Sequence, residues 1–462
     1  MSGQVPFIPA LAASSRVGVQ RSLLRRILSA QETGLVLVIV IIMTVLTFRS
    51  GSVPSPDREQ LPPGSTATVV AETVVATLPG GSTRSYAVAD GYGIDQRGAV
   101  VFIVRKERVF VSAGATVNEI DTPRGVEVLR DGARVGFYPV DAGWSAGQLD
   151  DGRKMIDRDP PRNKFLNKDN LILVATVASF IAIIAVGMTG IIVLGGIDLS
   201  VGSIYGLALV VGATVLNHWQ AGAGEQVIST GMVVPVGILL CCAVGAAAGL
   251  VNGSASVGLG VHPFIITLGG MAVYRGVAFV TTSGLSVGDL PPAYGQFVRA
   301  KVAGMNVVPT LTMVAIGLLG VLVFTRTVFG RRVFAIGGNE TAAKYAGVPV
   351  GLTKVITFTL CGMLAGLSAG LALGYYGSGS SADGTGYELE VIAAAVVGGA
   401  SLSGGRGSAL GAVLGAIIIQ LINNGFEVLG IDSSYRQIVI GLAIVLAVVV
   451  DQAKHRLMTA RR

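Results

Sequence analysis

Side chains that could do chemistry are scarce in this chain of 462 residues. Its three cysteines, Cys241, Cys242 and Cys361, stand in apolar runs, and an adjacent pair plus one distant thiol gives no metal-ligand spacing. The chain has no Gly-Lys dipeptide, so it lacks the phosphate-binding loop of ATPases. We therefore expect buried thiols, no metal, no cofactor and no catalytic residue. If ATP drives the protein, another chain must hydrolyse it.

Two charged residues fall within long apolar segments. Asp198 follows Gly195 and Gly196 and precedes Ser200, a pattern of helix-breaking glycines and helix-starting polar residues. Irregular backbone within a membrane is tolerated only where it is buried in protein or lines a cavity, so these four residues either cap the next helix or line a path. Arg275 stands near the middle of its segment, where a lone charge costs about 2.5 kcal/mol or more. We expect it to form a structural ion pair or to contact substrate.

The composition of the chain indicates which kind of secondary structure holds these residues. The chain is 51% hydrophobic and only 13% charged, whereas soluble proteins carry about 25% charged residues. This excludes an ordinary soluble enzyme and a nucleic-acid binder. We predict an all-α polytopic membrane protein with about ten transmembrane helices, some of them broken, plus a small β-rich insertion domain. The predicted spans are Gly34–Phe48, Leu171–Leu194, Val201–Leu216, Ser229–Val251, Phe264–Thr282, Val307–Phe324, Lys354–Tyr375, Glu390–Ala400, Ser408–Phe426 and Ile438–Val450.

Basic residues are distributed unevenly around these spans. Loops rich in Lys and Arg remain in the cytoplasm. If the N-terminus is cytoplasmic, the short outer loops hold only Arg299, Lys301 and Arg436. The cytoplasmic side then holds Arg16, Arg21, Arg25, Arg26, Arg326, Arg331, Arg332, Lys344, Lys354, Arg406, Lys454, Arg456, Arg461 and Arg462. Both termini are therefore predicted to be cytoplasmic.

The pattern changes between residues 50 and 168. Short runs rich in Val, Ile and Phe, the first of them a single predicted strand at Thr68–Ala76, alternate with turn residues, which predicts a β-rich domain outside the cytoplasm. Asp131-Gly132 between two such runs indicates a hairpin, and polar flanks at 50–64 and 147–163 resemble linkers. The interpretation is a structural cap or docking surface, or else a regulatory ligand site. The chain then divides into a cytoplasmic N-terminus with the first span (1–49), this insertion (50–168), a transmembrane core (169–453) and a cytoplasmic tail (454–462).

The longest cytoplasmic loop contains the signals of a short helix. Asn339 can cap it, Glu340 suits its positive start, and Lys344 can pair with Glu340. Gly347 fits the position after the helix, and Pro349 forbids continuation. We predict a two-turn helix over Glu340–Ala346 that lies free on the cytoplasmic face.

This helix would be either a docking element or a connector. Its sequence predicts a small apolar face for close approach by a partner, made by Ala342, Ala343 and Ala346 beside Thr341. Arg406, in a glycine-rich loop predicted to face the cytoplasm, is placed to touch the same partner. Glycines four residues apart at 245–253, 362–374 and 407–415 predict tightly packed helix pairs.

Several ordered stretches of the chain resemble the membrane permease subunits of bacterial sugar ABC importers, of the ribose, xylose, arabinose and galactose type. The resemblance covers the first span and the chain from Phe165 onward, whereas the insertion has no counterpart in typical members. The stretches are Ala185–Thr189, Gly195–Ser203, His262–Gly269, Tyr274–Gly276, Ala335–Gly347, Gly386–Glu390 and Gly398–Ser408.

The resemblance implies a function and partners. It implies import of a small sugar across the bacterial inner membrane, with an ABC ATPase subunit, an extracytoplasmic sugar-binding protein and a second permease copy or homologue. The helix at 340–346 becomes the coupling helix to the ATPase, with Asn339, Glu340, Thr341, Ala342, Ala343, Ala346, Gly347 and Arg406 as its contact residues. Alternatives are a branched-chain amino-acid or nucleoside ABC permease, an ion-coupled secondary transporter and a membrane-anchored sensor. Two buried charges are few for an ion relay.

Overall fold

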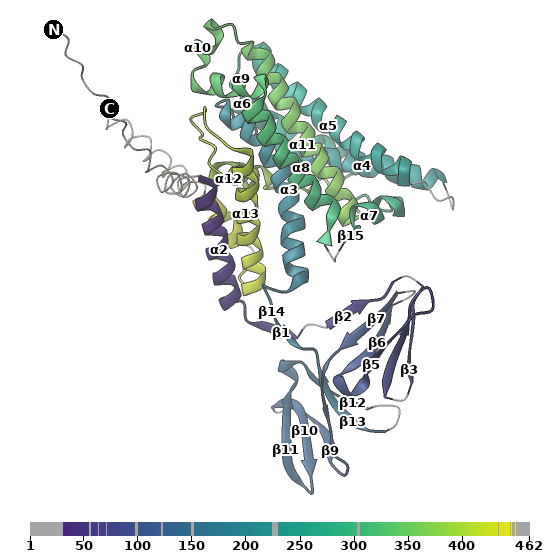
Figure 1. Cartoon of the computed structure of the whole chain (residues 1–462). Helices are drawn as coiled ribbons and strands as arrows, with labels where there is room; N and C mark the ends of the chain where they lie inside the picture. The colour runs from purple at the N-terminus through teal and green to yellow at the C-terminus, as the bar shows by residue number, and fades with distance from the viewer. Residues whose placement is uncertain are drawn as a thin grey trace, which may run out of the picture. The chain divides into compact units, whose positions relative to one another are not determined.

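The computed structural model describes residues 31–449, apart from 55–56, 63, 71, 98–99, 122, 149–151, 224–229, 303–304, 433, 444 and 446–448. The N-terminal arginines and the tail at 454–462 lie outside the described residues. The chain forms two compact units, one made of residues 1–46 and 169–462 and the other of residues 47–168. The first is a helix bundle and the second is built from β-strands (Figure 1).

Within the described residues, eight helices of the bundle are long and apolar enough to cross a membrane. They are α2 (Gln31–Arg49), α3 (Lys168–Val193), α4 (Val201–Ala223), α5 (Thr230–Leu259), α6 (Pro263–Thr282), α8 (Val307–Arg326), α11 (Val350–Tyr376) and α13 (Ala409–Leu429). Shorter elements are α7 (Pro292–Val298), the hairpin β15 (Lys301–Val302) with β16 (Met305–Asn306), α9 (Val328–Gly338), α10 (Glu340–Tyr345) and α12 (Tyr387–Val397).

The number of crossings differs from the ten predicted. The span predicted at Glu390–Ala400 corresponds to α12, whose 11 residues extend roughly 16 Å at 1.5 Å per residue. That is about half the thickness of the hydrocarbon core. The last predicted span is helical over 435–443, and part of it lies outside the described residues. A mostly helical membrane protein is confirmed, whereas the count of ten is not.

The outer surface of the bundle is apolar. Leu37 of α2, Leu239 of α5 and Val280 of α6 are 60%, 66% and 77% exposed. A soluble monomer rarely exposes apolar patches of this kind, whereas lipid chains can solvate them. The bundle is therefore suited to a membrane.

Close helix packing at the glycine strips is confirmed. Gly245 and Gly249 of α5 face Gly362 and Gly366 of α11, and a Cβ at Gly245 would overlap Gly362 O and lie 2.9 Å from Gly366 N. The third strip lies between α13 and α12, where a Cβ at Gly415 would overlap Ala394 O. Without side chains at these positions the helix backbones touch, which is how helices associate in lipid, where no hydrophobic effect drives them together.

The β-unit consists of a stalk and two three-stranded sheets in each of two halves. Strands β1 (Ser52–Pro54) and β14 (Pro161–Asn163) pair antiparallel where the chain enters and leaves it. The other strands are β2 (Asp57–Gln60), β3 (Thr66–Val70), β4 (Thr73–Thr77), β5 (Thr83–Ala87), β6 (Tyr92–Arg97), β7 (Val100–Arg105), β8 (Glu107–Phe110), β9 (Thr116–Asp121), β10 (Arg124–Arg130), β11 (Ala133–Pro139), β12 (Trp144–Gln148) and β13 (Lys154–Arg158). The sheets have the orders β3-β4-β5 and β2-β7-β6, then β11-β10-β9 and β12-β13-β8.

The two halves repeat one another. Strands β2 to β7 of the first half correspond one by one to β8 to β13 of the second, with the same pairings and a 3-10 turn after the fourth strand of each half, at Val88–Asp90 and Val140–Ala142. Each turn ends on a glycine in the left-handed region, with φ of 85° at Gly91 and 83° at Gly143. The β-unit is thus an internal duplication of about 50 residues.

Equivalent side chains also make equivalent contacts in the two halves. The ring centroids of Tyr86 and Tyr92 are 5.1 Å apart, and those of Tyr138 and Trp144 are also 5.1 Å apart. Arginines lie over the second ring of each pair, Arg105 over Tyr92 at 5.4 Å and Arg158 over Trp144 at 4.5 Å. Such stacked cations contribute about 0.5–1 kcal/mol at exposed sites.

Two predictions for this unit need correction, and one is confirmed. The apolar run at 68–76 forms two strands, β3 and β4, rather than one. The polar flanks contain β1 and β2 at one side and β12 to β14 at the other, because strand pairing can satisfy polar segments as well as apolar ones. The hairpin is confirmed at Asp131-Gly132, whose φ angles of 53° and 79° suit a tight turn with positive φ at both central residues.

We expect Arg108→Met to destabilise the β-unit by about 3–5 kcal/mol, because it leaves Asp157 buried without its partner. Arg108 Nη2 lies 2.8 Å from Asp157 Oδ2, and the two side chains are only 6% and 7% exposed. The measurement is urea unfolding followed by the fluorescence of Trp144, with the second tryptophan removed by Trp219→Phe. The control is Arg134→Met, which breaks an exposed pair with Glu127 and should change stability by about 0–1 kcal/mol. Equal shifts of the two midpoints would contradict the burial argument.

Candidate functional site

The predicted coupling helix is α10, at one tip of the bundle beside α9 (Figure 1). Its start is capped as the sequence indicates: Asn339 is extended, and its Oδ1 accepts a hydrogen bond from Ala342 N at 2.9 Å. Its end turns at Gly347, where φ is 81°, and Val348 N donates to Ala343 O at 3.0 Å. These bonds satisfy main-chain groups that helix ends otherwise leave open.

The predicted pairing of Glu340 with Lys344 is wrong. Glu340 Oε1 instead accepts a hydrogen bond from Lys354 Nζ of α11 at 2.7 Å. The Lys354 side chain is 22% exposed, so much of its freedom is already restricted by packing. An exposed pair four residues apart stabilises a helix by only about 0.3–0.5 kcal/mol. The ion pair therefore ties α10 to the bundle rather than stabilising α10 alone.

The predicted free position of this helix also needs correction. Ala343 is only 6% exposed and packs with Val193, Leu194, Val333 and Ile336. One face of α10 is therefore bound to the end of α3 and to α9. A short helix held on one side can transmit a displacement to the bundle, whereas a freely lying helix could not.

The opposite face of α10 is open. Its exposed residues are Thr341, Ala342, Lys344, Tyr345, Ala346 and Gly347. Tyr345 is 89% exposed, an unusual position for a large aromatic side chain on a well-packed loop. The sequence pattern did not single out Tyr345, because the predicted docking face consisted of small residues. The signal available was its position in the last turn of the helix, two residues before Gly347.

The glycine-rich loop around Arg406 lies against the same end of the bundle. Gly405 N donates to Val193 O at 2.8 Å, and a Cβ at Gly337 of α9 would lie 2.6 Å from Gly405 N. Ser401 N donates to Arg406 O at 3.0 Å and closes the loop. The structure therefore brings together α9, α10 and the Arg406 loop, which are far apart in the sequence.

The helical structure is interrupted between α3 and α4. Gly195 has a φ of 80°, and Asp198 Oδ1 accepts hydrogen bonds from Ser200 N at 2.8 Å and Ser200 Oγ at 2.6 Å. This is a capping arrangement at the start of α4. Asp198 and Ser200 are fully buried. In the part of the chain that the structure describes, Asp198 Oδ2 has no hydrogen-bond partner.

Two further helices are connected to this break. Asn252 of α5 donates through Nδ2 to Ser200 Oγ at 2.8 Å and accepts through Oδ1 from Tyr274 OH of α6, also at 2.8 Å. Leu199 N donates to Thr267 Oγ1 of α6 at 3.2 Å. This chain of buried polar groups fixes the positions of α4, α5 and α6 relative to one another.

Among the described residues, Arg275 does not form the predicted ion pair. It is half-buried, and its Nη1 donates to Ser381 O at 2.7 Å and to Asp383 O at 2.8 Å. A guanidinium has several donors and can satisfy main-chain carbonyl oxygens as well as carboxylates. Arg275 therefore holds the loop between α11 and α12 through two of its main-chain carbonyl oxygens.

This loop packs against the glycine face of α4. A Cβ at Gly206 would lie 2.7 Å from Asp383 O and 3.5 Å from Arg275 Nη1, and a Cβ at Gly202 would overlap Glu388 Oε2. Tyr205 and Tyr387 stack beside it with centroids 5.1 Å apart. The residues at the α3–α4 break and Arg275, singled out separately in the sequence, thus act on the same helix, α4.

We expect Arg275→Met to open the loop at 377–386, because it removes two hydrogen bonds from a charged donor, each contributing about 1.5–3 kcal/mol. Amide hydrogen exchange of that loop should accelerate by roughly tenfold or more, while exchange in α5 and α11 stays unchanged. The control is Arg299→Met, because Arg299 Nε donates within its own short segment, to Gly295 O. Unchanged exchange in the Arg275 variant would show that other contacts hold the loop.

Comparison with known proteins defines the class. Residues 170–448 match the family described as the branched-chain amino acid transport system / permease component. Together with the spanning helices this shows that the chain belongs to this permease family and is a multi-pass membrane permease subunit. No solved structure matches the chain.

Three curated relatives with similar sequences are sugar permeases. The chain is 37% identical over 310 residues to the galactose/methyl galactoside import permease of Escherichia coli strain K12, covering 65% of this chain and 90% of the relative. It is 38% identical over 294 residues to the ribose import permease of Bacillus subtilis strain 168, covering 63% and 87%. It is 34% identical over 288 residues to the D-allose transport system permease of Escherichia coli strain K12, covering 62% and 85%.

Proposed function

We propose that this chain is the permease subunit of an ATP-driven importer of a small sugar. It forms the translocation path together with a second permease copy or homologue. It does not hydrolyse ATP itself and couples to a separate ABC ATPase subunit, and an extracytoplasmic sugar-binding protein delivers the solute. The observation that carries the proposal is the similarity to galactose, ribose and allose permeases along nearly their whole length.

The proposed coupling site is the exposed face of α10. One side of α10 is anchored through Ala343 and through the Glu340–Lys354 pair, and the other side offers Tyr345 to a partner. A rigid displacement of α10 by the ATPase would pass to α9, to the end of α3 and to the Arg406 loop. Because α3 leads directly into the break at Asp198, the movement would reach α4 and its neighbours. Catalysis is not involved, and this chain acts as a gate.

Reconstituted transport tests the proposed function. The permease is placed in proteoliposomes with candidate ABC ATPase and solute-binding subunits from the same organism, and uptake of labelled galactose, ribose, allose, leucine and uridine is followed. We expect ATP-dependent uptake of one of the three sugars. Uptake of leucine or uridine instead would reassign the solute class. Uptake without the ATPase under a proton or sodium gradient would refute the ABC assignment.

We also propose that both termini are cytoplasmic and that the β-unit lies outside, from the uneven distribution of basic residues. A cysteine at Ser82, in an exposed turn before β5, should then react with an impermeant maleimide in intact cells whose outer barrier, if present, is permeabilised. The unaltered chain is the control, since its cysteines belong to α5 and α11. Labelling only after lysis would invert the topology.

A further inference from the structure

The β-unit contains a cavity that the permease function leaves unused. It has a volume of about 560 Å³ and is lined by Ala89, Asp90, Arg105, Lys106, Glu107, Arg108, Pro160, Pro161 and Arg162. Ligand pockets for small molecules commonly measure about 300–1,000 Å³. The cavity lies where the first repeat ends and the second begins, since β7 ends at Arg105 and β8 starts at Glu107.

The walls of this cavity are held rigidly. Lys106 N donates to Gly91 O at 2.9 Å, and the main chain of Lys106 packs so closely on Gly91 that a Cβ there would overlap Lys106 O. Arg108 is fixed by its two bonds to Asp157, at 2.8 and 2.9 Å, and by a third to Val88 O at 2.8 Å. The cavity is therefore formed before any ligand arrives.

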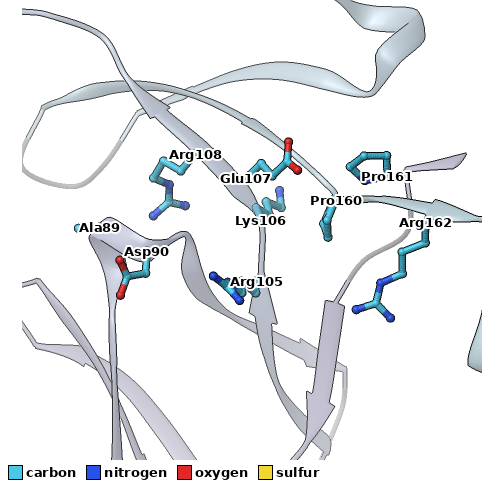
Figure 2. Close-up of a pocket in the computed structure, with 9 residues that line it drawn as sticks. All are labelled: Ala89, Asp90, Arg105, Lys106, Glu107, Arg108, Pro160, Pro161 and Arg162. Carbon is cyan, nitrogen blue, oxygen red and sulfur yellow. The ribbon is translucent and has the colours of Figure 1, made fainter. Parts of the chain in front are cut away.

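The charge of the cavity is positive. Four of its nine lining residues are cations and two are acids. One cation, Arg108, is paired with Asp157, and one acid, Glu107, is paired with Arg158. In Figure 2 the guanidinium groups of Arg105 and Arg108 and the carboxylate of Asp90 lie on one side, with Pro160, Pro161 and Arg162 on the other. Arg105 is kept in place by the ring of Tyr92. Two arginines with Asp90 thus face two prolines with Arg162, and this excess of positive charge beside apolar rings suits an anion with a carbon body.

We propose that this cavity binds a small organic anion that carries a phosphate or carboxylate group, and that the β-unit is a ligand-binding module of the permease. Lys106 and Arg105 contact the anionic group, and Pro160 and Pro161 contact the carbon body. Guanidinium and ammonium groups bind such oxyanions through charge-assisted hydrogen bonds. The proposal concerns a site outside the helix bundle and does not depend on which solute is transported.

The test uses the full chain in nanodiscs of zwitterionic lipid, titrated calorimetrically with glucose 6-phosphate, citrate, inorganic phosphate and glucose. At about 50 mM salt we expect glucose 6-phosphate or citrate to bind at least tenfold more tightly than glucose, and this difference should shrink at about 500 mM salt as charges are screened. Stronger binding of the phosphate ester than of citrate identifies a phosphate ligand, and the reverse identifies a carboxylate ligand. The proposal is overturned if glucose binds as tightly as glucose 6-phosphate and citrate do. It is also overturned if neither of these two anions binds.

Lys106→Met is the decisive variant, because the main chain of Lys106, rather than its side chain, makes the fold contacts. We expect it to weaken anion binding about tenfold, the loss of one charge-assisted hydrogen bond. The matched control is Lys154→Met, which removes one charge from an exposed strand position of the same unit and should leave the affinity within about twofold. An equal loss in both variants would show attraction by overall charge only and would reject the site. Unchanged binding in the Lys106 variant would do the same.

Discussion

Replacement of Tyr345 by alanine is expected to abolish ATP-driven uptake while leaving the helix bundle intact. Tyr345 is 89% exposed, so its removal costs the fold of the isolated permease little. Aromatic side chains buried at a protein interface commonly contribute about 2 kcal/mol or more, which corresponds to about 30-fold weaker retention of the partner. Two quantities are measured: the amount of ABC ATPase that copurifies with the permease, and sugar uptake in proteoliposomes.

Two neighbouring alanines separate docking from folding. Ala342 is exposed, so Ala342→Glu should weaken retention of the ATPase without lowering the melting temperature. Ala343 is buried among Val193, Val333 and Ile336, so Ala343→Glu should lower the melting temperature by burying an unpaired charge. Tyr435→Ala, at a tyrosine 56% exposed in another segment, is the control. Normal ATPase retention in both the Tyr345 and Ala342 variants would move the coupling site to the Arg406 loop.

The second large effect is expected at the contact between α5 and α11. Gly245→Ala places a methyl group against Gly362 O and 2.9 Å from Gly366 N, so the two helices must separate along the whole strip. Overpacking of a well-packed interior typically costs about 1–3 kcal/mol or more, and here the obstacle is main chain that cannot rotate away. We expect a strongly lowered melting temperature in detergent and loss of transport.

The matched control lies on the same helix. A Cβ at Gly258 of α5 would have no atom within 4 Å, so Gly258→Ala should be neutral or slightly stabilising because alanine favours helix over glycine by about 1 kcal/mol. If both substitutions have the same effect, the strip is not the contact that holds α5 to α11.

Local signals in the sequence predict local structure well. Asn339, Gly347 and Pro349 specify the ends of α10 because capping needs only neighbouring residues. Asp131-Gly132 specifies its hairpin for the same reason. The glycine strips indicate that helices meet closely, but the pairing of α5 with α11 and of α13 with α12 depends on the whole bundle and cannot be read from spacing.

Errors arise where a partner comes from a distant segment. Lys354 displaces Lys344 as the partner of Glu340 because α11 folds back beside α10. Arg275 binds carbonyl oxygens of a loop more than 100 residues away, which no local pattern reveals. Ala343 turns inward because α3 and α9 meet beneath it, and composition alone cannot tell a docking face from a packing face.

The duplication in the β-unit is a different case, because it was present in the sequence and still hard to see. The pattern Tyr-x-Val-x-x-Gly-aromatic occurs at 86–92 and again at 138–144. Few other identical residues support the duplication, since strand pairing constrains the backbone conformation more than the residue type. Only the matching sheet orders and the matching ring contacts make the repeat plain.

The pairing of β1 with β14 has a consequence for how this protein came to be. Ser52 lies opposite Asn163, and Asn163 Nδ2 donates to Thr47 O at 2.7 Å, so the chain enters and leaves the β-unit at one point. A segment with adjacent ends can be gained or lost in a single genetic event without altering the spacing of the helices on either side. The β-unit is therefore an insertion with adjoining ends, whose gain or loss, duplicated or not, leaves the chain path between α2 and α3 closed.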